Sequence, residues 1–286
     1  MTKFEEILKL GQLTLKKRLR SEIGEIVGWS KNSKIADGFL YYAGKLPVLL
    51  VAHLDTVHKE PPKLLMYSED SKIMNDFYGG IGGDDRCGVW MLLQILRKCK
   101  ENPPHLLFCE DEEIGGIGAE KFIASGINPP VNYIIELDRR GDNDAVFYGC
   151  GPVRRGGNAE FKRFICNYHN FIKYDSSTWY ALCPDGNGWF REARGTFSDI
   201  SVIAPALDLV AVNLSCGFFN EHSAEEYIRL DVMNRNVKRV VKIINAATER
   251  FDYVPVRKKA NVIQFGNLQP DFLTESGVDF DDYLPF

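Results

Sequence analysis

A histidine and an aspartate stand two residues apart in the segment Val51-Ala-His-Leu-Asp-Thr-Val57, at the end of the apolar run 46–52. Such a run, bounded by Gly44 and by polar residues, is typical of a strand buried on both faces. Because side chains alternate along a strand, His53 and Asp55 should point to the same side at its carboxyl end, where open α/β sheets bind ligands. The pair could be a metal ligand and the acid that orients it. The alternative is a strand that ends in an ordinary polar loop.

Two further apolar runs end in acids, and a third leads into a loop that contains a histidine; each run is typical of a short buried strand. Glu112 and Glu113 follow the run 105–109, Asp138 follows the run 131–137, and His222 lies in the loop after the run 207–214. Four acids in a row, as at 110–113, usually form a solvated turn, but here they follow a strand and precede glycines. The repetition predicts that four strand ends bring these side chains to one edge of a sheet.

A glycine-rich segment, Tyr78–Gly88, contains two adjacent aspartates, Asp84 and Asp85. Glycines permit close backbone approach and unusual dihedral angles, and either aspartate can cap the helix that Val89 and Leu92 indicate. Taken alone, helix capping is the simpler interpretation. A phosphate-binding loop is excluded because the Gly-Lys-Ser/Thr ending is missing.

If all of these groups meet, five carboxylates and two imidazoles share one edge of the sheet. Each close pair of like charges would cost on the order of 4 kcal/mol at an effective dielectric constant of about 20. Divalent cations would remove this cost, and mixed histidine and carboxylate ligands suit zinc as well as manganese or cobalt. The sequence therefore predicts a metal site at this edge.

The elements that must position these residues indicate one α/β domain. A chain of 286 residues with 45% hydrophobic content can bury a sizeable core. We expect a single catalytic domain over residues 1–286, with its core at about 35–250 and a C-terminal extension at 251–286. Apolar residues at helical spacing predict an amphipathic helix at 3–20 and a long helix at 231–250.

The formal net charge of −4 and the pI near 5.8 offer no basic field for nucleic acid. The first residues lack the pattern of a signal peptide, and no stretch approaches about 18 consecutive apolar residues. We therefore expect a cytoplasmic protein with no membrane partner. Seven scattered cysteines without a Cys-x-x-Cys pair indicate free thiols. The sequence leaves the oligomeric state open.

The chain resembles the co-catalytic zinc exopeptidases and amidohydrolases, the superfamily of peptidase T, carboxypeptidase G and aminoacylase. The resemblance covers residues 45–225 and rests on five blocks in the family's order: His53-x-Asp55, Gly83-Asp84-Asp85-Arg86-x-Gly88, Asp111-Glu112-Glu113, Asp138 and His222. Together these blocks are far more specific than any one of them. The resemblance implies a single three-layer α/β domain whose mixed, mostly parallel central sheet is flanked by helices.

The resemblance also implies a role for each residue. It implies two divalent metal ions, zinc with cobalt or manganese as alternatives. Asp84 would bind both ions, His53 and Asp138 would bind one of them, and Glu113 and His222 would bind the other. The position that matches Asp55 orients the histidine in the family, and the position that matches Glu112 is the general base.

Two features depart from the family pattern. Arg86 stands where the family often has lysine. Two-domain members insert a lid domain between the positions that match Asp138 and His222, whereas only residues 139–221 lie between them here, so we expect a reduced or absent lid. Residues 142–200 should supply loops and edge elements over the site. The candidates for substrate binding, with ordinary surface, structural or capping roles as the alternative, are Arg154, Arg155, Arg194, Ser198 and Asp199.

The implied activity is that of a dinuclear metallopeptidase or amidohydrolase that cleaves an amide bond. A metal-bridging water would attack the scissile carbonyl, and Glu112 would move its proton to the leaving amine. We expect an exopeptidase, an aminopeptidase or a di- or tripeptidase, acting on small peptides. One alternative is an N-acyl amino acid amidohydrolase or deacylase, which would use the same atoms. Another is a non-catalytic metal-binding relative, although no expected ligand or base is missing.

Overall fold

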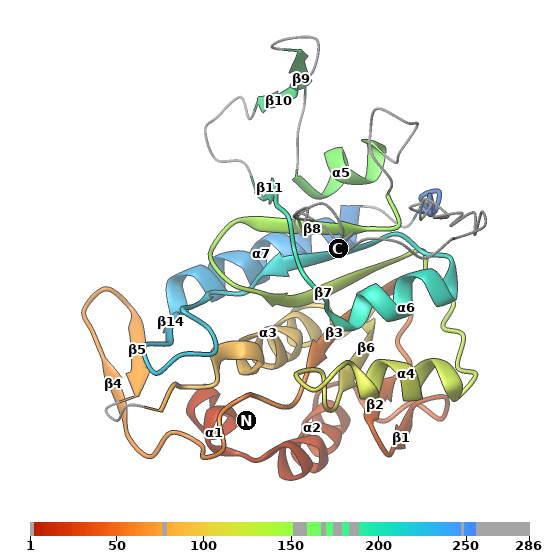
Figure 1. The fold of residues 1–286 in the computed structure, drawn as a ribbon. Helices are drawn as coiled ribbons and strands as arrows, with labels where there is room; N and C mark the ends of the chain where they lie inside the picture. The colour runs from red at the N-terminus through yellow and green to blue at the C-terminus, as the bar shows by residue number, and fades with distance from the viewer. Residues whose placement is uncertain are drawn as a thin grey trace, which may run out of the picture.

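The structure, a computed structural model, describes residues 3–75, 79–150, 159–166, 170–173, 179–182, 189–246 and 249–255. Within these residues an eight-stranded sheet forms the centre of the molecule (Figure 1). Its strands, in order across the sheet, are β1 (Lys34–Ala36), β2 (Phe39–Tyr42), β6 (Pro104–Cys109), β3 (Leu46–His53), β7 (Tyr133–Arg139), β12 (Ala211–Ser215), β8 (Asp144–Tyr148) and β11 (Arg191–Glu192). Strands β6, β3, β7 and β12 run parallel, and β2 and β8 run antiparallel to them. The expected mixed, mostly parallel sheet is confirmed.

Helices cover both faces of this sheet. One face packs against α1 (Phe4–Lys9), α2 (Gln12–Val27), α3 (Gly83–Lys98), α5 (Ala159–Cys166) and α7 (Leu230–Ala246), and the other against α4 (Ile117–Ala124) and α6 (Asp199–Leu207). Alternation along β3 explains why both faces are apolar, since Leu50 and Ala52 face the first group of helices whereas Leu49 and Val51 face the second. These three layers confirm the expected fold class.

The N-terminal segment differs from its prediction. Instead of one helix at 3–20 there are two, α1 and α2, and the second continues to Val27. Leu10 and Gly11 between them have extended backbone dihedrals. The periodicity does not reveal the break, because Ile7 and Leu15 on either side are both fully buried in the same core. The core therefore begins well before residue 35.

Shorter strands flank the main sheet. A four-stranded sheet consists of β13 (Phe218–Phe219), β14 (Tyr227–Arg229), β5 (Lys72–Asn75) and β4 (Leu65–Tyr67). A separate antiparallel pair is formed by β9 (Asn170–Lys173) and β10 (Trp179–Leu182). In the described part of residues 142–200, β8 and β11 extend the main sheet and α5 packs on its core. Apart from β9 and β10, the elements that the structure describes between 139 and 221 thus belong to the central domain, which accords with a reduced lid.

No helix among the described residues is long and apolar enough to cross a membrane. The six cysteines in the described part of the chain are buried and free.

Candidate active site

The carboxyl end of β3 presents His53, which is almost fully buried. Its Nδ1 lies 3.2 Å from Oδ1 of Asp55, and Asp55 also accepts the backbone N–H groups of Glu112 and Glu113, both at 3.1 Å. Burial raises the pKa of Asp55, but the hydrogen bonds from His53 and from the backbone outweigh it and hold the pKa below its usual value. Asp55 therefore fixes both the imidazole ring and the start of the acidic loop after β6.

The glycine-rich turn before α3 gives its two aspartates different roles. Asp84 and Asp85 have non-helical dihedral angles and a cis peptide bond between them. Asp85 Oδ1 accepts the N–H of Gly88 at 2.9 Å, which is the capping bond predicted for one of the pair. A Cβ on Gly88 would lie 1.8 Å from the carbonyl oxygen of Leu137, so glycine there lets α3 approach β7 closely. Asp84 instead lines the cavity of the candidate active site, which is described below.

A buried carboxylate that the sequence analysis missed holds this turn. Glu226, just before β14, accepts the backbone N–H groups of Ile81, Gly82 and Asp84 at 3.1, 2.8 and 3.0 Å. Its Oε2 also lies 2.8 Å from Nε2 of His58. No local pattern marks Glu226, because the backbone groups that it binds lie more than 140 residues earlier in the chain.

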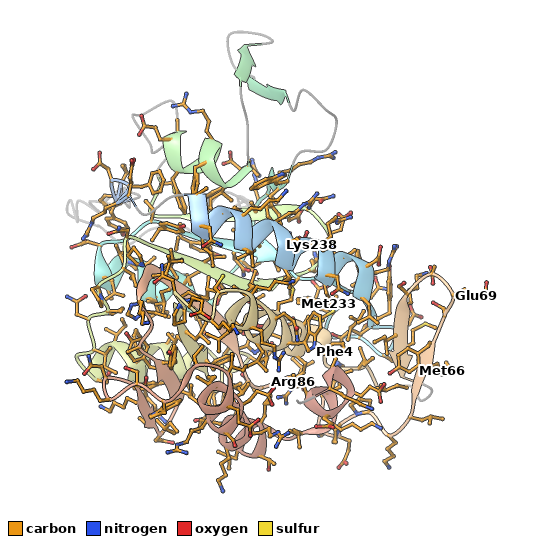
Figure 2. The ribbon with its side chains drawn as sticks, turned by 180° about the vertical axis from the view of Figure 1, so that it is seen from behind. Phe4, Met66, Glu69, Arg86, Met233 and Lys238 are labelled. Carbon is orange, nitrogen blue, oxygen red and sulfur yellow. The ribbon has the colours of Figure 1, made fainter. Side chains whose placement is uncertain are left out.

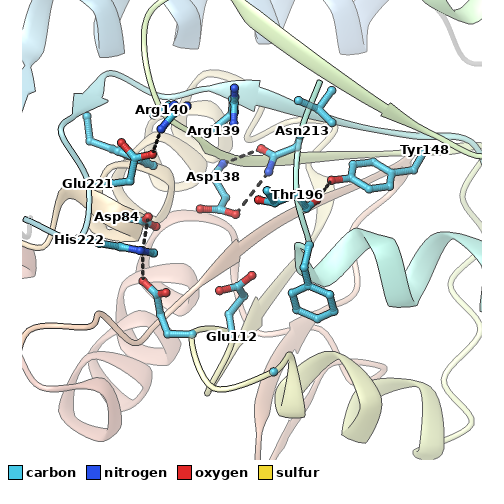
Figure 3. A pocket seen from close by; sticks show the side chains of 16 residues that line it. Asp84, Glu112, Asp138, Arg139, Arg140, Tyr148, Thr196, Asn213, Glu221 and His222 are labelled. Atoms are coloured by element: carbon cyan, nitrogen blue, oxygen red, sulfur yellow. Dashed lines mark hydrogen bonds and ion pairs between the residues drawn. The ribbon is translucent and has the colours of Figure 1, made fainter. Parts of the chain in front are cut away.

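The structure brings together all five residues expected to hold metal ions. Asp84, Asp138 and His222 are labelled in Figure 3. The five residues form two groups whose donor atoms lie within 4.8 Å of one another: His53, Asp84 and Asp138, and Asp84, Glu113 and His222. Asp84 Oδ1 lies 3.0 Å from Nε2 of His53, and its Oδ2 lies 3.2 Å from Nε2 of His222. The two oxygens of one carboxylate thus face different histidines, each within 3.4 Å of a second acid.

The donor set fits a divalent cation at each group. Each group offers one imidazole nitrogen and two carboxylates, a combination that suits zinc and related ions. Without a cation the acids repel one another: burial and then the charge of Asp84 raise the pKa of Asp138 to about 7. A bound cation would offset both effects.

Glu112 lies beside both groups and belongs to neither. Burial raises its pKa to about 9, with the charges of neighbouring acids adding to the effect. Nearby cations would favour the ionised form. Its place suits a group that exchanges a proton with a reactant in the cavity.

Asp84, Glu113, Asp138 and His222 line a cavity of about 270 Å³ together with Glu112, and the lining also includes residues that the sequence did not indicate. Asn213 on β12 holds Asp138, since its Oδ1 accepts the Asp138 N–H at 3.0 Å and its Nδ2 donates to Oδ2 at 3.3 Å. Arg140 pairs with Glu221 at 2.6 Å, and Arg139 stands beside it (Figure 3). The two arginines directly follow Asp138, which is the only signal that could have pointed to them.

The expected substrate-binding residues that the structure describes do not line this cavity. Arg154 and Arg155 fall outside the described residues. Arg194 is exposed and does not line the cavity, although Gly195, next to it, does. Ser198 and Asp199 are buried at the start of α6; Ser198 donates to the hydroxyl of Tyr148 at 3.4 Å and makes no capping hydrogen bond. The carboxylate of Asp199 accepts a hydrogen bond from the thiol of Cys109, and burial raises the pKa of Asp199 to about 7 despite that bond.

Solved structures share this fold. The aminopeptidase PepT from Bacillus cereus ATCC 10987 matches with a TM-score of 0.61 and 15% identity, over 84% of this chain and 96% of that one. A tripeptidase from Staphylococcus aureus subsp. aureus Mu50 matches with a TM-score of 0.61 and 14% identity, over 85% and 96%. At these identities the likeness concerns the fold.

Sequence comparison gives two further matches. A protein from Aspergillus terreus (strain NIH 2624 / FGSC A1156) named "Probable carboxypeptidase" is 38% identical over 88 residues, which is 29% of this chain and only 19% of that protein. The profile of peptidase family M20/M25/M40 matches residues 49–246, well over half of the chain and nearly all of the site. The chain therefore belongs to peptidase family M20/M25/M40.

Proposed function

We propose that the protein is a metal-dependent exopeptidase with two divalent cations, an aminopeptidase or a di- or tripeptidase. The observation that carries the proposal is the placement of Asp84, which offers one oxygen to each donor group, while Glu112 stands free beside both. The membership of a peptidase family and the fold shared with an aminopeptidase and a tripeptidase support it.

When bound, the cations would act as Lewis acids that polarise the scissile carbonyl and lower the pKa of the attacking water from 15.7 towards roughly 7. The protein's own groups would do the rest. Asp55 would accept a hydrogen bond from the protonated Nδ1 of His53, and this tautomer leaves the lone pair of Nε2 free to bind a metal ion. Glu112 would accept a proton from the attacking water and donate it to the leaving amine. Asn213 would hold Asp138 in its ligand orientation.

The size of the cavity supports a small substrate. A space of about 270 Å³ accommodates the end of a short peptide and excludes a folded chain. We propose zinc as the metal, with cobalt or manganese as alternatives, a small peptide as the substrate partner and the cytoplasm as the location.

A second candidate is an N-acyl amino acid amidohydrolase, which would use the same catalytic atoms. Arg139 and Arg140 in the cavity lining favour it. Each is paired with an acid, Arg139 with Asp144 and Arg140 with Glu221, and exchange of that acid would let the guanidinium bind the free carboxylate of such a substrate.

One panel of substrates tests both candidates. Purified protein, with its metal content measured, is assayed on di- and tripeptides with free termini, the same peptides with an acetylated N-terminus, and N-acyl amino acids. Cleavage of free peptides alone supports the exopeptidase, and cleavage of acylated amino acids alone supports the deacylase. Two metal ions per chain with no turnover of any substrate would contradict both.

A further inference from the structure

A second cavity, of about 230 Å³, is lined by none of the residues that line the first cavity, although Asp55, which orients His53, is part of its wall. It is enclosed by α1, by the loop 55–62 and by the start of α3. We call it the Arg86 cavity, because Arg86 from the first turn of α3 lines it beside α1 (Figure 2).

Arg86 is an unusual side chain to find in such a wall. It is 95% buried (5% exposed), and its Nε and Nη1 have no hydrogen-bond partner among the described residues. A guanidinium carries its positive charge at neutral pH. A buried cationic donor without an acceptor is unfavourable by itself.

Two acids, Asp55 and Asp85, have charges that act on Arg86, and both are hydrogen-bonded to other groups. Asp55 accepts hydrogen bonds at the candidate active site, as described above. Asp85 accepts the backbone N–H groups of His53 and Gly88. Both favour the charge of Arg86 from a distance, but neither is within ion-pair or hydrogen-bond distance of it. Glu60, the remaining acid of the lining, is exposed.

We propose that the Arg86 cavity binds a small aliphatic carboxylate, whose oxygens pair with the guanidinium of Arg86. A guanidinium matches a carboxylate with two parallel hydrogen bonds. Lys59 adds a second positive charge to the lining. The rest of the wall is mixed. Leu8 and Leu10 from α1 and Pro62 from the loop form its apolar part, beside polar residues such as Gln12 and Thr56, so an anion with a short hydrocarbon body finds apolar contacts that a bare inorganic ion cannot use.

Gly11 provides a test that leaves Arg86 in place. It lines the cavity, has an ordinary φ of −67°, and a Cβ added there meets no atom within 4 Å. It is also the N-cap of α2, a position that aspartate and asparagine both favour. Gly11→Asp and Gly11→Asn should therefore fold alike and differ in one negative charge at the cavity.

Titration calorimetry of the metal-loaded protein with isovalerate measures the effect. The wild type and Gly11→Asn should bind it, and Gly11→Asp should bind at least about fivefold more weakly because of charge repulsion. Isovaleramide, which has the same shape and no charge, should not bind. Carboxylate binding at the metal ions would be the same in both variants, so equal affinities would overturn the proposal, as would binding of the amide as tight as that of the acid.

Arg86 itself gives the second arm. Arg86→Met should abolish isovalerate binding, and Arg86→Lys should weaken it and retain part of it, with melting temperature and metal content confirming that each variant is folded. Undiminished binding by Arg86→Met would refute the proposal. Inorganic phosphate is titrated in parallel, and binding of phosphate without binding of isovalerate would show that the carboxylate assignment is wrong.

Discussion

Two pairs of neighbouring acids show how single atoms decide what a residue does. The carboxylate of Asp85 accepts hydrogen bonds from backbone N–H groups, whereas that of Asp84 next to it faces two histidines. Glu113 lies 3.1 Å from His222, whereas Glu112 contacts neither histidine. In each pair the residues are chemically alike, so their different surroundings predict different responses to the same substitution.

Glu112→Gln should keep the metal ions and the fold but reduce kcat by on the order of 10² to 10⁴, because the amide cannot accept the proton. Metal content per chain and turnover of a cleaved peptide measure the two effects. Glu113→Gln is the matched control, and it should lose metal as well as activity. If Glu112→Gln loses metal and Glu113→Gln does not, the two residues have each other's roles.

Asp84→Asn should remove most of the sensitivity to chelators. Metal binding stabilises the native state by roughly 4 kcal/mol at a thousandfold excess over Kd, so chelation should lower the melting temperature of the wild type by several degrees. The variant loses the ligand shared by both ions and one of the repelling charges. Glu221→Gln, an acid of the same cavity outside both donor groups, should behave like the wild type. Equal chelator shifts in the wild type and Asp84→Asn would refute the shared role.

The chelator effect should also depend on pH. In the metal-free protein the pKa of Asp138 is raised to about 7, above its unfolded value, so protonation favours the folded state and this contribution is lost as pH rises through about 7. Chelation should therefore cost more at pH 8 than at pH 5.5. Thermal melts at the two pH values, with and without chelator, measure the difference, and a larger shift at pH 5.5 would contradict it.

At the scale of the elements, strands β2 and β6 carry a pH-dependent contact away from the metal site. Tyr41 on β2 lies 2.7 Å from Nδ1 of His105 on β6, and burial lowers the pKa of His105 to about 4. The unfolded chain, with a pKa near 6.5, takes up a proton that the folded chain refuses, so stability is lost as pH falls from about 6.5 to 4.

His105→Gln removes this titration. The stability of the wild type relative to the variant should fall by up to about 3 kcal/mol between pH 7 and pH 4. Urea unfolding of both proteins at several pH values measures it, and subtraction removes the contribution of the acidic cluster that they share. A constant difference across this range would show that His105 does not titrate as its burial indicates.

The sequence could predict the four central strands and the residues at their ends, because long apolar runs and their polar ends are local features. It could not predict Glu226, whose partners lie on a turn far back in the chain, or Asn213, which stands inside an apolar run. The break at Gly11 was hidden because both helices bury apolar residues in one core. Strands as short as β13 depend on pairing with distant segments and leave no periodicity to detect.

On the scale of the whole molecule, the N-terminal helices belong to the same core as the catalytic edge. Leu15 is fully buried in that core, whereas Leu13, two residues earlier on α2, is 64% exposed. Leu15→Ala should lower the free energy of unfolding by about 2 to 5 kcal/mol in a single transition, and Leu13→Ala should change it by less than about 0.5 kcal/mol. Denaturant melts followed by two probes measure this, and a separate early transition in Leu15→Ala would show that the helices unfold on their own.

The residues that would hold the cations come from five separate segments, and the last of them, His222, follows a strand, β12, that inserts between β7 and β8. A chain that emerges from the ribosome amino end first therefore has one donor group long before the other. It cannot complete the second until more than two hundred residues are free to fold. On the proposed mechanism, the growing protein is inactive through most of its own synthesis, so the unfinished enzyme does not hydrolyse the nascent peptides around it.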